Sequence, residues 1–235
     1  SKSAVAFTGA GISVPSGIPD FRSPGGLWSK YNPIEVASAQ ALEMNPKGVW
    51  EFMLDASDLL VKCEPNSAHY AMAKLEHNNM LQGIITQNID NLHQRANSQN
   101  VVEFHGNFQR FFCQKCSCEY SRERVYEDIR NQGIPLYCHI CPGLIRPDVV
   151  FFGEAIPRFA QSESSHLVKN AQVAIIAGTS GEVAPANTMP KQVKMNGGKI
   201  IEINLGSTYF TDITDVRFNE SVEVVMPKLA DLCLS

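Results

Sequence analysis

The sequence predicts an α/β fold in which a doubly wound parallel sheet carries two inserts. Short apolar runs rich in β-branched residues alternate with longer amphipathic segments, the pattern of buried parallel strands separated by helices. Two stretches interrupt this alternation: residues 30–78 have a mostly helical pattern, and residues 110–145 are rich in cysteine and polar residues. We therefore expect a Rossmann-like sheet with a helical insert and a small cysteine-rich insert.

Six apolar runs are the expected strands of the parallel sheet. They lie at residues 4–7, 83–86, 101–104, 148–152, 173–178 and 199–204. The clearest helices are expected at residues 46–62 and 66–78. The expected division is a discontinuous Rossmann-like domain of residues 1–29, 79–109 and 146–235, a helical module of residues 30–78, and a third module of residues 110–145.

Composition limits the kinds of partner. The 235 residues are 44% hydrophobic, enough to bury a substantial core, and the net charge is −4 with no long basic run, so nucleic acid is not an expected partner. No stretch approaches the roughly 18 consecutive apolar residues of a membrane span, and the first residues, SKSAVAF, lack the features of a signal peptide. Seven cysteines, an odd number, fit a reducing compartment. We expect a soluble, intracellular and cytoplasmic protein without a membrane partner.

Two cysteine pairs form the strongest metal-binding pattern in the chain. Cys113-x-x-Cys116 is followed, after 21 residues, by Cys138-x-x-Cys141, the arrangement in which two knuckles supply four thiolates to one zinc ion. Free buried thiols or disulfides would not explain why the x-x spacing occurs twice. We expect one structural Zn2+ per chain, whose closed site leaves no position for water.

The loop after the first expected strand, GAGISV, departs from the dinucleotide fingerprint G-x-G-x-x-G. Gly9 and Gly11 supply the first two glycines, but Val14 stands at the third position. The two glycines would let the backbone approach a ligand, and the amides would suit an anion at a helix start. A tight strand-to-helix turn is the alternative interpretation. The next segment, residues 16–26, is rich in Gly and Pro and is expected to be a lid over the site.

Polar residues follow four of the expected strands, and the carboxyl ends of parallel strands meet at one crevice. Each residue alone fits a helix cap or a turn, but together with the glycine loop they are expected to line a site. They are Gln87, Asn88, Asp90, His105, Asn107, Gly178, Thr179, Ser180 and Asn204.

Of the six histidines, His105 alone directly follows an apolar strand and has a glycine beside it, so it is the candidate general base. His93 is expected to make a structural contact on a helix. His139 lies inside the cysteine-rich insert, where it and Cys118 leave the register of the zinc ligands open. The remaining three, His69, His77 and His166, are expected on helix surfaces.

The order of the motifs GAGIS, GIPDFR, TQNID with LH, HG, the paired CxxC, PDVVFFGE, GTS and IN resembles the sirtuin family, the NAD-dependent protein deacylases. The resemblance spans essentially the whole chain and explains the missing third glycine, because these enzymes bind NAD in an altered orientation and break it rather than reduce it. It implies NAD as cofactor and an acyl-lysine-containing protein or peptide as substrate. The implied reaction removes the acyl group from lysine and releases nicotinamide and O-acyl-ADP-ribose.

The resemblance also implies residues for each part of NAD. The pyrophosphate and adjoining ribose would meet Gly9, Ala10, Gly11, Ile12 and Ser13, with Arg22 near the phosphates. Asp20 and Phe21 would belong to the lid over the nicotinamide, and Gln87 would hold the nicotinamide ribose. The nicotinamide pocket would comprise Ile18, Asn88, Ile89 and Asp90. The adenosine half would meet Gly178, Ser180, Asn204 and Val216, with Thr179 of the same GTS motif also assigned to the cofactor.

For the chemistry, the resemblance implies that the acyl oxygen of the modified lysine attacks C1′ of the nicotinamide ribose and nicotinamide leaves. A ribose hydroxyl, deprotonated with help from His105, then attacks the resulting imidate, and water releases lysine and acylated ADP-ribose. Asn88 and Asp90 complete the implied catalytic set. The substrate peptide would lie by β-addition along Val149, Val150, Phe151, Phe152 and Gly153.

Departures from the family pattern bear on the substrate. Members that act on acidic acyl groups carry Tyr-x-x-Arg on the helix after the lid, and the aligned positions here are Met53 and Ala56. We expect an apolar acyl channel that suits acetyl groups and leaves longer apolar acyl groups open, with packing of this helix in the core as the alternative. Asn97, Gly181 and Gly206 also replace the family's usual Gly, Leu and Glu, which would reshape contacts with NAD.

Other functions stay open at this point. Mono-ADP-ribosyl transfer would use the same NAD pocket and hand ADP-ribose to a side chain. A zinc-containing nicotinamide dehydrogenase would need an open zinc site and an acidic residue at the end of the second strand, neither of which the sequence offers. A zinc-knuckle binding module would explain the cysteines and leave the other motifs unused.

Overall fold

The computed structural model describes residues 3–20 and 31–235 and contains a six-stranded sheet in the order β3-β2-β1-β7-β8-β9. Its strands are β1 (Ala4–Thr8), β2 (Leu81–Thr86), β3 (Val101–Glu103), β7 (Val173–Ala177), β8 (Lys199–Ile203) and β9 (Val216–Phe218). All neighbouring strands run parallel. The direction of winding reverses between β1 and β7, which places a ligand crevice at the carboxyl ends of these two strands.

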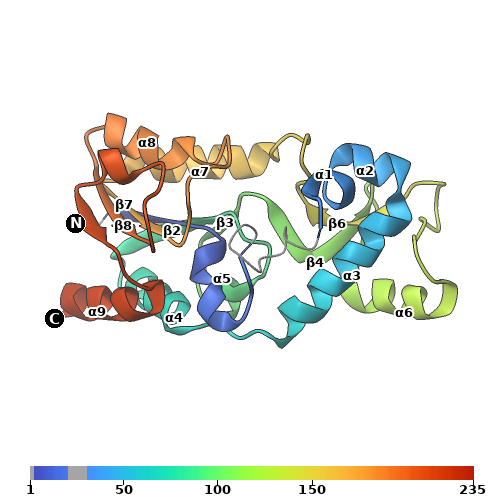
Figure 1. Ribbon diagram of the computed structural model, residues 1–235, viewed down its shortest axis with the longest axis horizontal. Coiled ribbons are helices and arrows are strands. Elements are labelled where there is room, and N and C mark those ends of the chain that lie inside the picture. Colours follow the sequence, from blue (N-terminus) through green and yellow to red (C-terminus); the bar gives the residue numbers. More distant parts are fainter. Residues whose placement is uncertain (1–2, 21–30) are drawn as a thin grey trace.

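Helices cover both faces of this sheet, so its central strands are apolar along their whole length. All five residues of β1 are buried. One face packs against α7 (Arg158–Asn170) and α8 (Thr188–Met195), and the other packs against α4 (Ser67–His77) and α9 (Val222–Leu234) (Figure 1). Each face has its own apolar cluster. The predicted doubly wound sheet is therefore confirmed.

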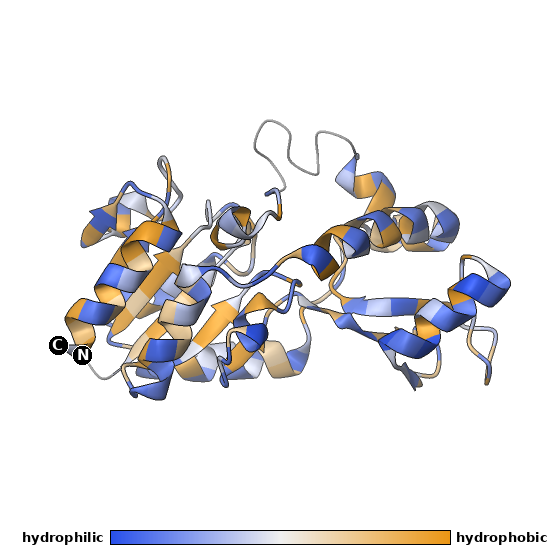
Figure 2. Ribbon diagram, turned by 90° about the horizontal axis from the view of Figure 1, so that it is seen from below, coloured by the Kyte–Doolittle hydropathy of each residue, from blue (hydrophilic) through white to orange (hydrophobic). Residues whose placement is uncertain are grey.

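A smaller lobe contains an antiparallel sheet in the order β5-β4-β6 and several helices (Figure 2). Its strands are β4 (Gly106–Cys113), β5 (Glu119–Tyr120) and β6 (Ile145–Val149), and its helices are α1 (Pro33–Val36), α2 (Ala39–Met44), α3 (Pro46–Lys62) and α6 (Arg122–Gln132). A third apolar cluster holds these elements together. Within it, the ring of Trp50 on α3 stacks on that of Phe111 on β4, with centroids 6.2 Å apart.

The prediction that residues 148–152 form a strand of the parallel sheet is wrong. β6 ends at Val149 and pairs antiparallel with β4, Gly106 facing Val149 and Asn107 facing Asp148. The chain that leaves β4 turns through the cysteine-rich insert and returns beside β4, so the apolar run completes the small sheet. The composition of a short apolar run does not distinguish the two sheets, because the pairing partner is set by the path of the chain.

The helices predicted at residues 46–62 and 66–78 correspond to α3 and α4. α4 packs against α9 and β2, whereas α1, α2 and α3 pack with one another. We therefore propose that the helical module ends before α4; the other predicted domain bounds stay predictions. Within residues 3–20 and 31–235, every helix is too short or too polar to cross a membrane.

Candidate functional site

The loop after β1 packs backbone to backbone against the loop after β7. Gly11 N–H donates to Gly178 O at 2.8 Å, and Gly9 N–H donates to Ala177 O at 3.3 Å. A Cβ on Gly11 would lie 2.8 Å from Gly178 Cα, and a Cβ on Gly178, whose φ is +64°, would lie 2.2 Å from Ile12 N. The glycines therefore serve to bring two strand ends together at the point where the winding of the sheet reverses.

Two 3-10 turns, η1 (Ala10–Ile12) and η2 (Val14–Ser16), follow β1 where a helix start was expected. Ile12 and Ser13 are buried, Ala10 and Gly11 are half-buried, and Ile18 is 8% exposed within the third apolar cluster. Asp20 is half-buried. Phe21 and Arg22 lie outside the described residues, so the lid stays a prediction.

Asp90 is buried between the glycine loop and the segment after β2. Ser13 Oγ donates to Asp90 Oδ2 at 2.7 Å, and Leu92 N–H donates to Oδ1 at 2.9 Å. Asn88 Nδ2 donates to Gly9 O and to Ser13 Oγ, both at 3.1 Å. Burial raises the pKa of the Asp90 carboxyl, against the hydrogen bonds from Leu92 and Ser13, which lower it. The structure thus brings together polar residues of two distant segments.

His105 lies in the turn between β3 and β4, with Nδ1 3.1 Å from Gln87 O. A carbonyl oxygen only accepts hydrogen bonds, so Nδ1 carries the proton of the neutral ring and Nε2 keeps the lone pair. Burial lowers the pKa of His105, while the bond to Gln87 O raises it. The side chain of Gln87 donates from Nε2 to Thr179 Oγ1 at 3.0 Å. A neutral imidazole is therefore fixed at the strand ends with Nε2 available as a base.

The remaining residues assigned to the cofactor lie at the ends of β7, β8 and β9. Ser180 O accepts from Tyr209 N–H at 2.9 Å, and Asn204 N–H donates to Phe218 O at 3.2 Å. Val216, the first residue of β9, is 47% exposed. Ser180 and Asn204 follow β7 and β8, so they lie at the same edge of the parallel sheet as the glycine loop, whereas Val216 begins β9 and pairs with Ile201 in the middle of β8.

The unusual glycines of this region have conformations that favour glycine. Gly181 and Gly206 have φ values of +76° and +75°. A Cβ on Gly181 would lie 2.5 Å from the ring of Phe210, so this ring leaves no room for a larger residue at position 181. Asn97, which stands where the family usually has Gly, also has a positive φ, of +70°.

The backbone of the expected substrate segment is largely bonded within the chain. Val150 N–H donates to His105 O at 2.9 Å. Phe152 N–H donates to Ala37 O at 2.9 Å, and Phe152 O accepts from Ala39 N–H at 3.0 Å. Val149 and Val150 are half-buried, Phe151 is buried, and Phe152 and Gly153 are exposed. The segment therefore borders both His105 and the α1–α2 connection.

Sequence reasoning missed an ion pair between a buried arginine and a half-buried glutamate that supports this segment. Arg146 on β6 is 4% exposed, and both of its terminal nitrogens donate to the carboxylate of Glu154. Arg146 Nη2 also donates to Val149 O at 2.6 Å, and the guanidinium lies 4.4 Å from the centroid of the Phe151 ring. Glu154 Oε2 accepts from Phe151 N–H at 2.9 Å. The signal in the sequence was an Arg and a Glu on either side of the apolar run DVVFF.

The four paired cysteines form one cluster, with all four sulfurs within 4.8 Å of one another. Sγ–Sγ distances are 3.5 Å for Cys113 and Cys141 and 3.7 Å for Cys116 and Cys138. A tetrahedral zinc ion with bonds of about 2.3 Å places its sulfurs roughly 3.8 Å apart, so the cluster fits zinc. The other two candidates, Cys118 and His139, lie outside the cluster, so the structure groups the same four cysteines that the spacing of the sequence grouped.

The helix that was expected to face the acyl group packs into the smaller lobe. Met53 is 2% exposed and belongs to the same apolar cluster as Ile18 and Phe151. Ala56, one turn further along α3, is half-buried. Residues three apart share one face of a helix, so both positions lie on one side of α3.

The prediction that His69 lies on a helix surface is wrong. His69 is fully buried, and its ring lies against that of His93 with centroids 4.8 Å apart. His69 is the third residue of α4, and its Nδ1 accepts from Asn66 N–H at 3.3 Å in a capping box that turns the ring inward. His93 is a buried contact, as predicted, and His77 and His166 are exposed.

Comparisons with known proteins agree with this arrangement. A family model described as the Sir2 family matches residues 9–185. The NAD-dependent protein deacetylase of Sulfurisphaera tokodaii is 45% identical over 97% of this chain and 90% of its own length. The NAD-dependent protein deacylase of Thermococcus kodakarensis is 45% identical over 96% of this chain and 89% of its own length.

Solved structures of related enzymes have the same fold. A Sir2 enzyme with a deacetylated p53 peptide and 3′-O-acetyl ADP ribose is 38% identical, with a TM-score of 0.91 over 97% of this chain and 92% of the other. A Sir2 enzyme bound to a propionylated peptide is 36% identical, with a TM-score of 0.88 over 98% of this chain and 92% of the other. Because the family model covers most of the chain and these relatives match nearly all of it, the chain belongs to the Sir2 family, as its motif order predicted.

Proposed function

We propose that this protein is an NAD-dependent protein lysine deacylase that releases nicotinamide and O-acyl-ADP-ribose. One observation carries the proposal: in a member of the Sir2 family, His105 keeps a lone pair on Nε2 at the strand ends where Asn88, Asp90 and Ser13 meet. Relatives are named for deacetylation or deacylation, and solved relatives carry an acetylated ADP ribose or a propionylated peptide. These ligands favour deacylation over mono-ADP-ribosyl transfer in the same pocket.

The nicotinamide ring is assigned to the space bounded by Asn88, Asp90 and Ser13, with Ile18 and Ile89 as apolar walls. The Asp90 carboxylate, already fixed by Ser13 and Leu92, would accept from the carboxamide of the ring. The pyrophosphate is assigned to the backbone amides of residues 9–13. NAD supplies a glycosidic bond whose cleavage opens C1′ to the acyl oxygen of the substrate lysine.

The adenosine half is assigned to the residues that follow β7 and β8 and to the start of β9. The residues proposed for it are Gly178, Thr179, Ser180, Asn204 and Val216. Gln87 is assigned to the nicotinamide ribose, and its backbone oxygen also orients the ring of His105. One residue would therefore position both the ribose and the base that acts on it.

The proposed base is Nε2 of His105, which takes a proton from a ribose hydroxyl. Because burial lowers the pKa of His105, Nε2 stays unprotonated at neutral pH. His105 O accepts from Val150 N–H, so the base is also tied to the segment proposed to bind the peptide. The amides of Val150 and Phe152 already donate within the chain, and we therefore place the first peptide hydrogen bonds at Gly153.

Acetyl-lysine and other apolar acyl-lysines are the proposed substrates. Met53 lies in one apolar cluster with Ile18 and Phe151, and neither Met53 nor Ala56 offers a cation to an acidic acyl group. No nucleic-acid or membrane partner is proposed. All seven cysteines are free, and a four-thiolate zinc site needs reduced thiols, so we propose an intracellular, cytoplasmic location.

The test incubates the full chain with NAD and with peptides that carry acetyl-, myristoyl- or succinyl-lysine. Nicotinamide and deacylated peptide are measured together, and we expect both from the acetyl peptide and little of either from the succinyl peptide. His105→Ala should abolish deacylation while the protein stays folded, and His166→Ala, at an exposed histidine, should not. Nicotinamide without deacylated lysine would instead indicate ADP-ribosyl transfer or NAD hydrolysis.

A further inference from the structure

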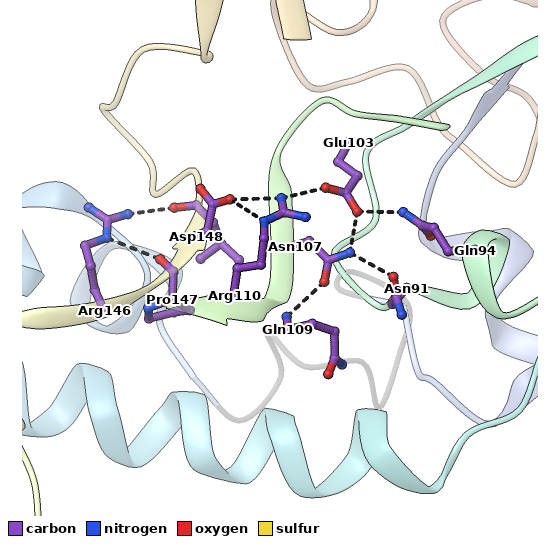
Figure 3. A network of polar contacts seen from close by, with 10 residues as sticks. Asn91, Gln94, Glu103, Asn107, Gln109, Arg110, Arg146, Pro147 and Asp148 are labelled. Carbon is purple, nitrogen blue, oxygen red and sulfur yellow. Dashed lines mark hydrogen bonds and ion pairs between the residues drawn. The ribbon is translucent and has the colours of Figure 1, made fainter. Parts of the chain in front are cut away.

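A polar network joins the strand that leads into His105 to the strand that follows it (Figure 3). Glu103 is the last residue of β3, and its side chain is only 16% exposed. Its carboxylate accepts from Arg110 Nη2 and from Gln94 Nε2, each at 2.6 Å, and also from Asn107 Nδ2. Three donors hold the carboxylate in one position.

Arg110 extends the network to β6. Arg110 Nε donates to Asp148 Oδ2 at 2.9 Å (Figure 3). Asp148 pairs with Asn107 across the small sheet, and two residues later Val150 N–H donates to His105 O. The side chain of Arg110 therefore links Glu103 at the end of β3 to Asp148 on β6, and these are the two backbone segments that hold His105.

Asn107 extends the network to the segment that carries Asp90. Asn107 is 2% exposed, and its Nδ2 also donates to Asn91 Oδ1 at 3.0 Å. The adjacent Phe108 N–H donates to Ile89 O at 3.1 Å. Asn91 has a φ of +66°, a conformation that costs free energy and therefore needs support from its neighbours. The turn with His105 and the segment with Asp90 are thus fixed relative to each other.

We infer that Arg110, through its ion pairs with Glu103 and Asp148, is a positioning residue for His105. The inference rests on the proposed function. Arg110 acts on the base, His105, through the backbone. Its effect falls on the step that needs the base, removal of the ribose hydroxyl proton, and spares the earlier loss of nicotinamide. A displacement of the base by about 1 Å is enough to slow such a step up to roughly a hundredfold. A role limited to joining the two lobes would weaken both steps equally.

The test measures two reactions of the full chain. Exchange of labelled nicotinamide into NAD, in the presence of an acetyl-lysine peptide, reports the step before the base acts, and release of deacetylated peptide reports the steps after it. Arg110 is 53% exposed, so its substitution leaves the core intact. We expect Arg110→Gln to lower peptide release roughly tenfold and to change exchange by less than about twofold. Arg110→Lys keeps a cation and should recover most of the release.

The matched control is Arg124→Gln. Arg124 is also 53% exposed and pairs with Asp128 on α6, away from the network. In Arg124→Gln, the ratio of peptide release to nicotinamide exchange should equal that of the unaltered chain. The positioning role would be overturned if Arg110→Gln lowered both reactions equally or changed neither. It would also be overturned if Arg124→Gln showed the same altered ratio. If the unaltered chain performs neither reaction, the proposed function fails first and the positioning role falls with it.

Discussion

His69 and His93 lie ring against ring in the core, with centroids 4.8 Å apart. His93 Nε2 is 3.0 Å from Thr8 Oγ1 at the end of β1, and His69 Nδ1 accepts from Asn66 N–H at the start of α4. The pair therefore connects the strand before the glycine loop to a covering helix. Burial lowers the pKa of His69 to about 4, and burial together with His69 lowers that of His93 well below its usual value.

The first prediction is that this pair makes the protein sensitive to mild acid. Between pH 6.5 and pH 4 the unfolded chain binds a proton at His69 and the folded chain does not, so stability rises with pH in this range. The stabilisation is complete above pH 6.5 and is lost as the pH falls. We expect His69 alone to remove about 2 kcal/mol of unfolding free energy between pH 7 and pH 5. Urea unfolding at the two pH values measures it.

The matched variants are His69→Gln and His166→Gln. His69→Gln cannot titrate, so its stability should change less between pH 7 and pH 5 than that of the unaltered chain. His166 is exposed on α7, and His166→Gln should keep the full pH dependence. An unchanged pH dependence in His69→Gln would show that other groups cause the effect.

The second prediction concerns the zinc cluster. Cys138→Ser should lower bound zinc well below one ion per chain and open residues 110–145 to protease, because a structural zinc site contributes about 10 kcal/mol of binding free energy to folding. Cys118→Ser, a cysteine of the same insert outside the cluster, should keep one zinc ion and the same protease resistance. Zinc content and limited proteolysis measure both. An insert that stays protease-resistant after chelation would contradict the structural role.

The sequence predicted those features that depend on local patterns. Five strands of the large sheet (β1, β2, β3, β7 and β8) and the helices α3 and α4 appear where apolar periodicity placed them, because buried parallel strands are apolar throughout and surface helices are amphipathic. The sixth strand, β9, was not predicted, because its three residues VRF are exposed and form no apolar run. The zinc cluster was predictable because each pair of ligands is local and the two pairs repeat one spacing. The residues brought to the strand ends by β1 and β2 were predictable because all parallel strands end at one edge.

The remaining features depend on contacts between distant parts of the chain. Whether residues 148–152 join the large or the small sheet is decided by where the insert returns the chain. His69 was misplaced because its helix carries a second buried stripe against His93, which a single apolar period does not reveal. The pairing of Arg146 with Glu154 was missed because charged residues are usually exposed, and only the fold shows that Arg146 is buried with both terminal nitrogens bonded to Glu154.

The third prediction concerns Arg146 and Glu154. Glu154→Gln leaves the buried Arg146 without its carboxylate and loosens residues 149–154, so we expect the KM for the acetyl-lysine peptide to rise about tenfold. The KM for NAD should change by less than about twofold, because the Arg146–Glu154 pair does not support the glycine loop. Steady-state kinetics with each substrate varied in turn measures both constants. Glu163→Gln on α7 is the control, and an equal rise of both KM values would contradict a role confined to the peptide segment.

The fourth prediction compares two glycines with similar positive φ angles. Gly106, beside His105, has a φ of +82°, and a Cβ there would lie 2.0 Å from Asp148 O; Gly133 has a φ of +77°, and a Cβ there would meet no atom within 4 Å. Gly133 has a ψ of −167°, a backbone conformation that almost only glycine adopts, so Gly133→Ala should cost the strain of that conformation, about 1–3 kcal/mol, with deacetylation unchanged. Gly106→Ala adds a clash with the backbone of β6 and should cost at least about 2 kcal/mol more. Because β6 and the His105 turn must separate to relieve that clash, peptide release should also fall by roughly tenfold or more.

Thermal unfolding and peptide release in the two variants measure both effects. Equal stability and equal activity of the two variants would mean that the approach of β6 to the His105 turn is not required for catalysis.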